Sequence, residues 1–238
     1  MLKYALVTGA SGGIGKAIAR RLADSGYGLY LHYHRNESEI QSLVDQIENV
    51  PVYAIRADFT EKHAVTQLLA EIHHEIDTII HNSANTYFGL MTDMRDEEVF
   101  DMVQLQVTSP FLLTKYLIPN MIKKRQGNII VISSIWGFTG ASCEVLYSMV
   151  KGGLNTFVKA LAKEVAPSGV RVNGVAPGAI ETKMNSRLSE EELRALEQDI
   201  PMGRLGKPSE VADLVEFLIS GRAAYINGEI ISINGAWY

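Results

Sequence analysis

Apolar residues along this chain recur with two alternating periods, which predicts a regular succession of strands and helices. Short runs rich in apolar and β-branched residues predict strands, and longer segments with apolar positions three or four residues apart predict helices. Residues 129–132 are apolar throughout, as expected for a parallel strand covered on both faces. Strands are predicted over residues 4–8, 28–33, 52–55, 78–80, 128–133, 170–176 and 229–233, and helices over 15–25, 38–47, 61–72, 96–124, 147–166 and 208–218.

This order predicts an α/β fold, a Rossmann-type doubly wound parallel sheet with helices on both faces. A length of 238 residues is typical of one such unit, so we expect a single domain over residues 1–238. Between residues 177 and 204 the pattern loosens into a Pro-Gly turn, an acidic segment whose helix cap is Ser189, and Pro201. We expect this stretch to be a mobile substrate loop.

Composition narrows the class of protein further. Hydrophobic residues make up 47% of the chain and charged residues 21%, which excludes disordered and collagen-like proteins. The net charge of −5 disfavours nucleic acid as a partner, because phosphate backbones require a basic surface. We expect no membrane span or signal peptide, since the apolar runs are too short. Cys143 is the single cysteine and cannot form an internal disulfide, which favours the cytoplasm.

The segment 8–15, Thr-Gly-Ala-Ser-Gly-Gly-Ile-Gly, directly follows the first predicted strand and precedes the first predicted helix. In that context glycines permit a sharp turn and a close approach of the backbone to a pyrophosphate, while the helix start attracts the anion. The alternative is a flexible loop without a ligand. The predicted phosphate-binding residues are Gly9, Ser11, Gly13, Ile14 and Gly15.

The end of the second predicted strand indicates which dinucleotide is bound. It carries no Asp or Glu where an NAD enzyme would bind the ribose 2′-hydroxyl, and Arg35 stands there instead. A guanidinium offers a planar set of donors to a 2′-phosphate, so NADP(H) is the expected cofactor, with Asn36 assisting. The alternative is that Arg35 is a solvated loop charge.

A candidate proton donor lies on a later helix. Tyr147 and Lys151 are four residues apart and therefore share one helix face. The nearby cation is expected to lower the pKa of the phenol from about 10, so that Tyr147 can protonate a carbonyl oxygen as hydride reaches its carbon. Ser134, at the end of the fifth strand, could hold the same oxygen. The alternative is an ordinary exposed Tyr/Lys pair.

Together these residues resemble the short-chain dehydrogenase/reductase family over essentially the whole chain. The glycine-rich segment, Ser134, Tyr147-x-x-x-Lys151 and a Pro-Gly pair follow one another in the usual order. The resemblance implies that Tyr147 is the general acid/base, that Lys151 binds the nicotinamide ribose and that Ser134 anchors the carbonyl. It also implies further cofactor contacts from Asp58, Phe59, Asn82, Pro177, Gly178, Ile180 and Thr182.

Among the departures of the chain from the family pattern, two concern residues 81–84 and Gln106. Where relatives usually read Asn-Asn-Ala-Gly, residues 81–84 read His-Asn-Ser-Ala. The asparagine that usually completes the proton relay aligns with Gln106, whose longer side chain can hold the relay water with a different geometry. We therefore expect Gln106 to belong to the catalytic set.

The last third of the chain most resembles bacterial 3-oxoacyl-[acyl-carrier-protein] reductases, which implies a 3-oxoacyl thioester substrate. In those enzymes basic residues near the mouth receive the acidic carrier; Arg125 stands at one such place, and Ser168 replaces another arginine. A related branch reduces a 5-aminopentanone group on a lysine of elongation factor P, and His-Asn-Ser together with Cys143-Glu144-x-x-Tyr147 favours this alternative.

The charge of the entrance bears on that choice of substrate. An acidic mouth would favour a cationic substrate, although a solvated helix face explains the same carboxylates equally well. The glutamates expected near the entrance are Glu144, Glu181, Glu190, Glu191 and Glu192.

Three further expectations complete the interpretation. His32 and His34 alternate along a strand, but no Cys or Glu-x-x-His pattern supports a metal site, so none is expected. A non-catalytic dinucleotide-binding sensor is a remote alternative, disfavoured because Tyr147 and Lys151 are both present. The family resemblance implies a homotetramer, built through the long helices and the last strand, with the C-terminal end buried in a partner.

Overall fold

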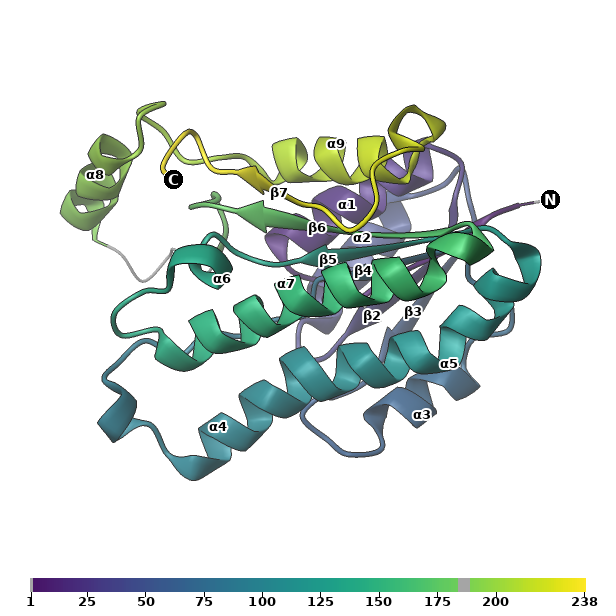
Figure 1. Cartoon of the computed structure of the whole chain (residues 1–238), viewed down its shortest axis with the longest axis horizontal. Coiled ribbons are helices and arrows are strands. Elements are labelled where there is room, and N and C mark those ends of the chain that lie inside the picture. Colours follow the sequence, from purple (N-terminus) through teal and green to yellow (C-terminus); the bar gives the residue numbers. More distant parts are fainter. Residues whose placement is uncertain (1, 184–188) are drawn as a thin grey trace.

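A computed structural model describes residues 2–183 and 189–238 (Figure 1). Within these residues a seven-stranded sheet has the order β3-β2-β1-β4-β5-β6-β7, and all paired strands are parallel. The order reverses between β1 and β4, so the predicted doubly wound Rossmann-type sheet is confirmed. The strands are β1 (Tyr4–Val7), β2 (Gly28–Tyr33), β3 (Val52–Arg56), β4 (Thr78–His81), β5 (Gly127–Ile132), β6 (Val170–Pro177) and β7 (Ile230–Ile233).

Helices cover both faces of the sheet (Figure 1). One face carries α1 (Gly13–Asp24), α2 (Glu37–Gln46) and α9 (Pro208–Ile219); the other carries α3 (Ala64–Ala70), α5 (Ser109–Lys124) and α7 (Val145–Val165). The remaining helical segments are α4 (Asp96–Val103), α6 (Trp136–Thr139), α8 (Glu190–Asp199), the π-helical turn η2 (Gln104–Thr108) and the 3₁₀ turns Met91–Asp93, Ala166–Ser168 and Gly221–Ala223.

Each central strand contributes to two separate cores because successive side chains point to opposite faces. Ile130 packs into the core under α1 and α9, whereas Ile129 and Val131 pack into the core under α5 and α7. All three are 0–1% exposed. This two-sided burial explains why the sequence of β5 is apolar throughout.

The long helical region predicted over residues 96–124 is confirmed, but it is not one regular α-helix. The segment is α4, then η2, then α5, and the π-helical turn inserts an extra residue into the helical period. The turn places Gln106 in the interior, with 1% of its surface exposed. Helical periodicity does not reveal such a local bulge, because the apolar spacing on either side is unchanged.

The expected substrate loop contains one well-defined helix. Ser189 caps α8, since its hydroxyl accepts a hydrogen bond from the Glu192 amide at 3.2 Å, while the Glu192 carboxylate accepts one from the Ser189 amide at 2.8 Å. Figure 1 shows α8 near the C-terminus. Residues 184–188 of this loop lie outside the described residues, and its mobility stays a prediction.

Among the described helices, none combines the length and the apolar character needed to traverse a bilayer.

Candidate active site

The candidate residues gather at one edge of the sheet because parallel strands end on the same side. The glycine-rich loop follows β1, Asn82 follows β4, Ser134 follows β5, and Gly178 follows β6. This edge contains the point where the strand order reverses, which is where ligands bind in doubly wound sheets.

In the glycine-rich loop, Gly9, Gly13 and Gly15 are packed so closely that a Cβ would come within 3 Å of a neighbouring atom. Gly9 has φ of +64°, and a Cβ on Gly15 would lie 2.3 Å from the Gly9 carbonyl oxygen. A Cβ on Gly13 would lie 2.9 Å from Cγ2 of Thr182, so Thr182 lies against the loop; its contact with the cofactor stays a prediction. The N-cap of α1 is Gly12, which has no side chain to occupy the first amide groups of the helix. These features fit a dinucleotide pyrophosphate.

Asn82 shapes the glycine-rich loop from the neighbouring strand. Its Nδ2 donates hydrogen bonds to the carbonyl oxygens of Thr8 at 3.0 Å and Gly9 at 3.1 Å. The Thr8 hydroxyl in turn accepts from the amides of Asn82 and Ser83 at 2.9 and 3.0 Å. The ends of β1 and β4 are thereby tied together. Ile14 packs against the core under α1, and Ser11 is half-buried in the loop.

The residues expected on the adenine side lie after β2 and β3. Asp58 accepts hydrogen bonds from the Thr60 amide at 3.1 Å and hydroxyl at 2.8 Å, and lies 3.2 Å from Nε2 of His34. Burial is the largest single influence on the pKa of Asp58 and raises it, but the Thr60 hydrogen bonds, His34 and Arg35 outweigh burial and leave the pKa lowered. Arg35 is exposed close to this carboxylate. Phe59 is buried.

The loop after β6 is anchored on both sides. The Pro177 carbonyl accepts a hydrogen bond from the Ile135 amide at 3.1 Å, and the Gly178 amide donates to the Ile233 carbonyl at 2.9 Å. Ile180 is buried and pairs with Gly206 in an isolated β-bridge. These contacts hold the loop beside the end of β5.

The structure brings Ser134, Tyr147 and Lys151 together. Lys151 is 3% exposed; its Nζ donates to the Ile132 carbonyl at 2.9 Å and lies 5.4 Å from the centroid of the Tyr147 ring. The Ser134 side chain forms a hydrogen bond with Tyr147, and its Oγ accepts another from the Trp136 amide at 3.2 Å. Helix α7 therefore presents both candidate residues to the end of β5.

The expectation that Lys151 lowers the pKa of Tyr147 is wrong in this structure. Burial and then the charge of Glu144 raise the pKa of Tyr147 to about 12, and the hydrogen bond with Ser134 offsets only part of that rise. Burial also lowers the pKa of Lys151 to about 8. The phenolate would be desolvated beside a carboxylate, while the Lys151 ammonium is directed at the Ile132 carbonyl.

Gln106 is buried, and only the nitrogen of its side-chain amide forms hydrogen bonds with described residues. Its Nε2 donates to the Asn85 carbonyl at 2.8 Å and to Asn85 Oδ1 at 3.2 Å. Its Oε1 is buried and has no hydrogen-bond partner among the described residues. No motif in the sequence indicated Asn85, because this contact depends on the π-helical turn.

Among the glutamates expected at the entrance, Glu144 lies close enough to the phenol to affect its pKa. Glu144 immediately precedes α7 and accepts a hydrogen bond from the Thr86 hydroxyl at 2.7 Å. Glu190, Glu191 and Glu192 occupy the first turn of α8, where carboxylates stabilise the positive end of a helix. Glu181 is exposed.

Arg125 is not at this mouth. It ends α5, donates a hydrogen bond to the Pro167 carbonyl at 3.0 Å, and precedes the first residue of β5. Arg125 precedes β5 and Ser134 follows it, so the two residues lie at opposite ends of this strand. Within one chain, Arg125 therefore does not have the position near the mouth that the resemblance implied.

The C-terminal end packs within the chain rather than standing free. The ring of Trp136 meets Trp237 and Tyr238 edge-on, with centroids 5.3 and 5.6 Å apart. The last two residues thus lie beside α6, close to Ser134, although Tyr238 remains 62% exposed.

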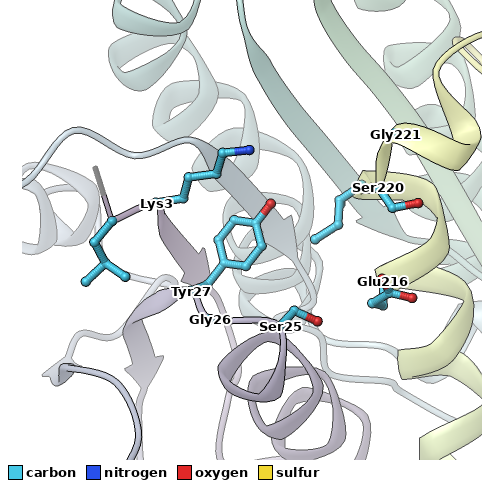
Figure 2. A pocket seen from close by; sticks show the side chains of 9 residues that line it. Lys3, Ser25, Gly26, Tyr27, Glu216, Ser220 and Gly221 are labelled. Carbon is cyan, nitrogen blue, oxygen red and sulfur yellow. The ribbon is translucent and has the colours of Figure 1, made fainter.

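A cavity of about 460 Å³ lies at the opposite edge of the sheet (Figure 2). Tyr27 directly precedes β2 and Lys3 precedes β1, so this cavity opens at the amino ends of the strands. The cavity includes no predicted site residue. Its lining residues are Leu2, Lys3, Ser25, Gly26, Tyr27, Glu216, Ile219, Ser220 and Gly221. In the described part of the chain, no three His, Cys, Asp or Glu side chains group as a metal site.

Comparisons with known proteins agree with this geometry. A family model described as enoyl-(acyl carrier protein) reductase matches residues 9–236. The chain is 48% identical over 241 residues to the uncharacterized oxidoreductase YmfI of Bacillus subtilis (strain 168), covering all of both chains. It is 40% identical to the 3-oxoacyl-[acyl-carrier-protein] reductase FabG of Vibrio cholerae and 38% identical to that of Escherichia coli (strain K12), covering 99% of this chain and 97% of each relative.

A solved structure described as a short chain dehydrogenase/reductase family protein superposes with a TM-score of 0.90 at 24% identity, covering 98% of this chain and 96% of the other. At that identity the likeness establishes the fold. The family model and the FabG relatives carry the assignment further. This chain belongs to the short-chain dehydrogenase/reductase family of oxidoreductases and is close to the 3-oxoacyl-[acyl-carrier-protein] reductases.

Proposed function

We propose that the chain is an NADP(H)-dependent reductase that converts a ketone to an alcohol. The observation that carries this proposal is the meeting of Ser134, Tyr147 and Lys151 beside a glycine-rich loop shaped for a dinucleotide. The reduced nicotinamide supplies the hydride when it is bound. The chain's own residues hold the carbonyl oxygen and provide the proton.

The two hydroxyl groups act on the same oxygen. Ser134 donates a hydrogen bond to the carbonyl oxygen and holds it beside the phenol of Tyr147. Since its pKa is raised to about 12, Tyr147 is protonated at neutral pH and can give its proton to that oxygen. The rise leaves this protonated population nearly the same as at the ordinary pKa of about 10, so it is compatible with the role of proton donor.

Lys151 and Gln106 have supporting roles: Lys151 in holding the cofactor and Gln106 in proton transfer. The resemblance assigns Lys151 to the nicotinamide ribose, and its position beside the Tyr147 ring is compatible with that role. The buried Oε1 of Gln106 is an acceptor available to a water molecule, and a water there would serve the relay usually served by asparagine.

We propose NADP(H) over NAD(H) because of Arg35. The described residues place this guanidinium on the surface after β2, close to Asp58 and without an acidic residue at the usual 2′-hydroxyl position. A 2′-phosphate would give Arg35 a dianionic partner. Together with the single cysteine, this cofactor is consistent with a cytoplasmic enzyme.

The first candidate substrate is a 3-oxoacyl thioester on an acyl carrier protein. The FabG relatives, which the comparisons describe as 3-oxoacyl-[acyl-carrier-protein] reductases, support it at 38–40% identity over nearly the full chain. Arg125 gives this candidate no support within one chain, because it lies at the far edge of the sheet.

The second candidate is a cationic ketone, the 5-aminopentanone group on a lysine of elongation factor P. One specific observation favours it: the carboxylate of Glu144 lies close enough to Tyr147 to raise the pKa of the phenol. A negative charge at that position would attract an ammonium group carried by the substrate.

The assembly we propose is a homotetramer. Large apolar side chains on α4, α5 and α7 are unusually exposed for a monomer, and together they form the face on which the family resemblance places the contacts between chains. The exposed members are Phe100, Phe111, Tyr116, Val145 and Met149.

Tyr147→Phe tests the catalytic assignment. Removing the hydroxyl removes the acid, so the rate of NADPH oxidation with a ketone should fall about 10²-fold or more while NADPH still binds. Rates are measured at saturating NADPH, and affinity is measured by nucleotide fluorescence. Equal rates for wild type and variant would contradict the assignment and favour a non-catalytic nucleotide-binding protein.

Arg35→Ala tests the choice of cofactor. Loss of a charge-assisted contact with the 2′-phosphate should weaken NADPH binding about 10- to 100-fold and leave the dissociation constant for NADH unchanged. The matched control is Arg56→Ala, which removes an exposed guanidinium bonded to the carbonyl oxygen of His34. An NADPH preference that survives in Arg35→Ala would show that the residue is misassigned.

A side-by-side rate measurement separates the two substrates. Wild type is given an acetoacetyl thioester and, separately, factor P bearing the ketone-modified lysine. The first candidate predicts faster turnover of the thioester and no specific effect of Glu144→Gln on it. The second predicts a large preference for factor P that Glu144→Gln reduces about tenfold. If Glu144→Gln changed both rates equally, its effect would lie in the phenol rather than in substrate charge.

Solution mass tests the assembly. We expect light scattering to give four times the chain mass, and Phe111→Glu, which puts a charge on the exposed apolar face, to give smaller species. The control is Ser42→Glu, which puts the same charge on an exposed position of α2, away from that face and from the last strand. A monomer for wild type at micromolar concentration would contradict the tetramer.

A further inference from the structure

His32 is a buried polar residue that the catalytic interpretation does not use. It lies on β2, is 3% exposed, and stacks its ring on Phe59 with centroids 3.9 Å apart and an interplanar angle of 11°. Its Nδ1 lies 3.2 Å from the Gly9 amide nitrogen, and its Nε2 lies 3.0 Å from the Ala57 carbonyl oxygen. One ring therefore contacts the segments that follow β1 and β3.

The partners fix the protonation of this ring. A carbonyl oxygen only accepts, so Nε2 carries the proton and donates to Ala57; an amide N–H only donates, so Nδ1 of His32 is the acceptor for Gly9. Burial is the main influence on the pKa of His32 and lowers it to about 4, which keeps the ring neutral near pH 7. Both nitrogens are thus committed to the protein.

A third contact explains one departure of the chain from its family. The Ser83 hydroxyl also lies 3.2 Å from Nδ1 of His32, and Ser83 is one of the positions at which residues 81–84 depart from the usual Asn-Asn-Ala-Gly. The serine and the histidine therefore form a pair across the ends of β2 and β4. A neighbour without a hydroxyl could not make this contact.

The atoms that His32 holds are those that define the cofactor site. Gly9 adopts φ of +64°, and its carbonyl accepts from the Gly12 amide at 3.1 Å and from Asn82, so its peptide orientation sets the shape of the phosphate loop. Phe59 and Ala57 flank Asp58, the residue expected at the adenine ring. A substitution at His32 would therefore affect both the phosphate loop and the adenine side of the site.

We propose that His32 is a positioning residue for the dinucleotide, which holds the phosphate loop through Gly9 and the adenine side through Ala57 and Phe59 in one rigid unit. This inference rests on the proposed function, because it assumes that the loop binds NADP(H). It assigns no contact between His32 and the cofactor. The effect is expected in cofactor affinity, while the rate at saturating cofactor stays close to that of wild type.

Two amide substitutions separate the two bonds. His32→Asn puts an amide oxygen near the position of Nδ1 and keeps an acceptor for Gly9, whereas His32→Gln puts its amide near Nε2 and leaves Gly9 without one. We expect the dissociation constant for NADP⁺, measured by calorimetry, to rise in both variants: about threefold in His32→Asn, which loses the bond to Ala57, and about tenfold or more in His32→Gln, which leaves Gly9 of the phosphate loop without its acceptor. The control pair is His63→Asn and His63→Gln, at an exposed histidine before α3.

Melting temperatures without cofactor distinguish positioning from mere stability. A structural role alone predicts that both variants lose stability and that affinity follows stability in each; equal dissociation constants for the two variants would overturn the proposal. Failure of the wild-type protein to bind NADP⁺ would instead contradict the proposed function, on which this inference rests. Imidazole ¹⁵N NMR of wild type tests the inference without any variant: we expect a protonated Nε2 and an unprotonated Nδ1 at His32, and the opposite tautomer would refute it.

Discussion

The candidate site depends on the burial of one ammonium group. Lys151 is almost fully enclosed between α7 and β5, and placing a lone charge there is unfavourable by several kcal/mol unless polar groups meet it. The Ile132 carbonyl meets one of its three N–H donors. One turn further along α7, Asn155 accepts a hydrogen bond from the Ser133 hydroxyl at 2.6 Å. Successive turns of α7 are thus fixed to the end of β5, and Tyr147 reaches Ser134 as a result.

Local patterns in the sequence were enough to predict the elements that carry this site. The glycine-rich loop, the order of strands and helices, and the shared helix face of Tyr147 and Lys151 all depend on residues close together in the chain. The tertiary contacts were not accessible in the same way. Glu144 meets Thr86 across 58 positions, and this approach, together with burial, sets the pKa of the phenol opposite to expectation.

The π-helical turn and the position of Arg125 were missed for different reasons. The turn preserves the apolar spacing on both sides, so periodicity alone predicts one continuous helix through Gln106. Arg125 was expected near the mouth of the site only because of the family resemblance. A residue that lies near the site in an assembly of several chains is not necessarily near it within one chain. The direction of β5 decides the matter, because it separates Arg125 from Ser134 by the full length of the strand.

His32 and His34, at the end of β2, illustrate how strand geometry gives similar residues different surroundings. Side chains two apart share a face, yet His32 lies within the strand and His34 just beyond its end. His32 is enclosed beneath the glycine-rich loop, whereas His34 is half-exposed beside Asp58. In the fold each histidine has separate partners: His32 contacts Gly9 and Ala57, and His34 contacts Asp58.

The raised pKa of Tyr147 also bears on its proposed role as a proton donor. A donor must be protonated, and a phenol whose pKa is about 12 meets that condition at pH 7. A phenol at its ordinary pKa of about 10 meets it too, so the rise leaves the protonated population nearly unchanged and makes the phenol a weaker acid. Burial and the negative charge of Glu144 cause that rise. The tertiary environment of the phenol, rather than its helical neighbour Lys151, therefore sets how readily the proposed donor gives up its proton.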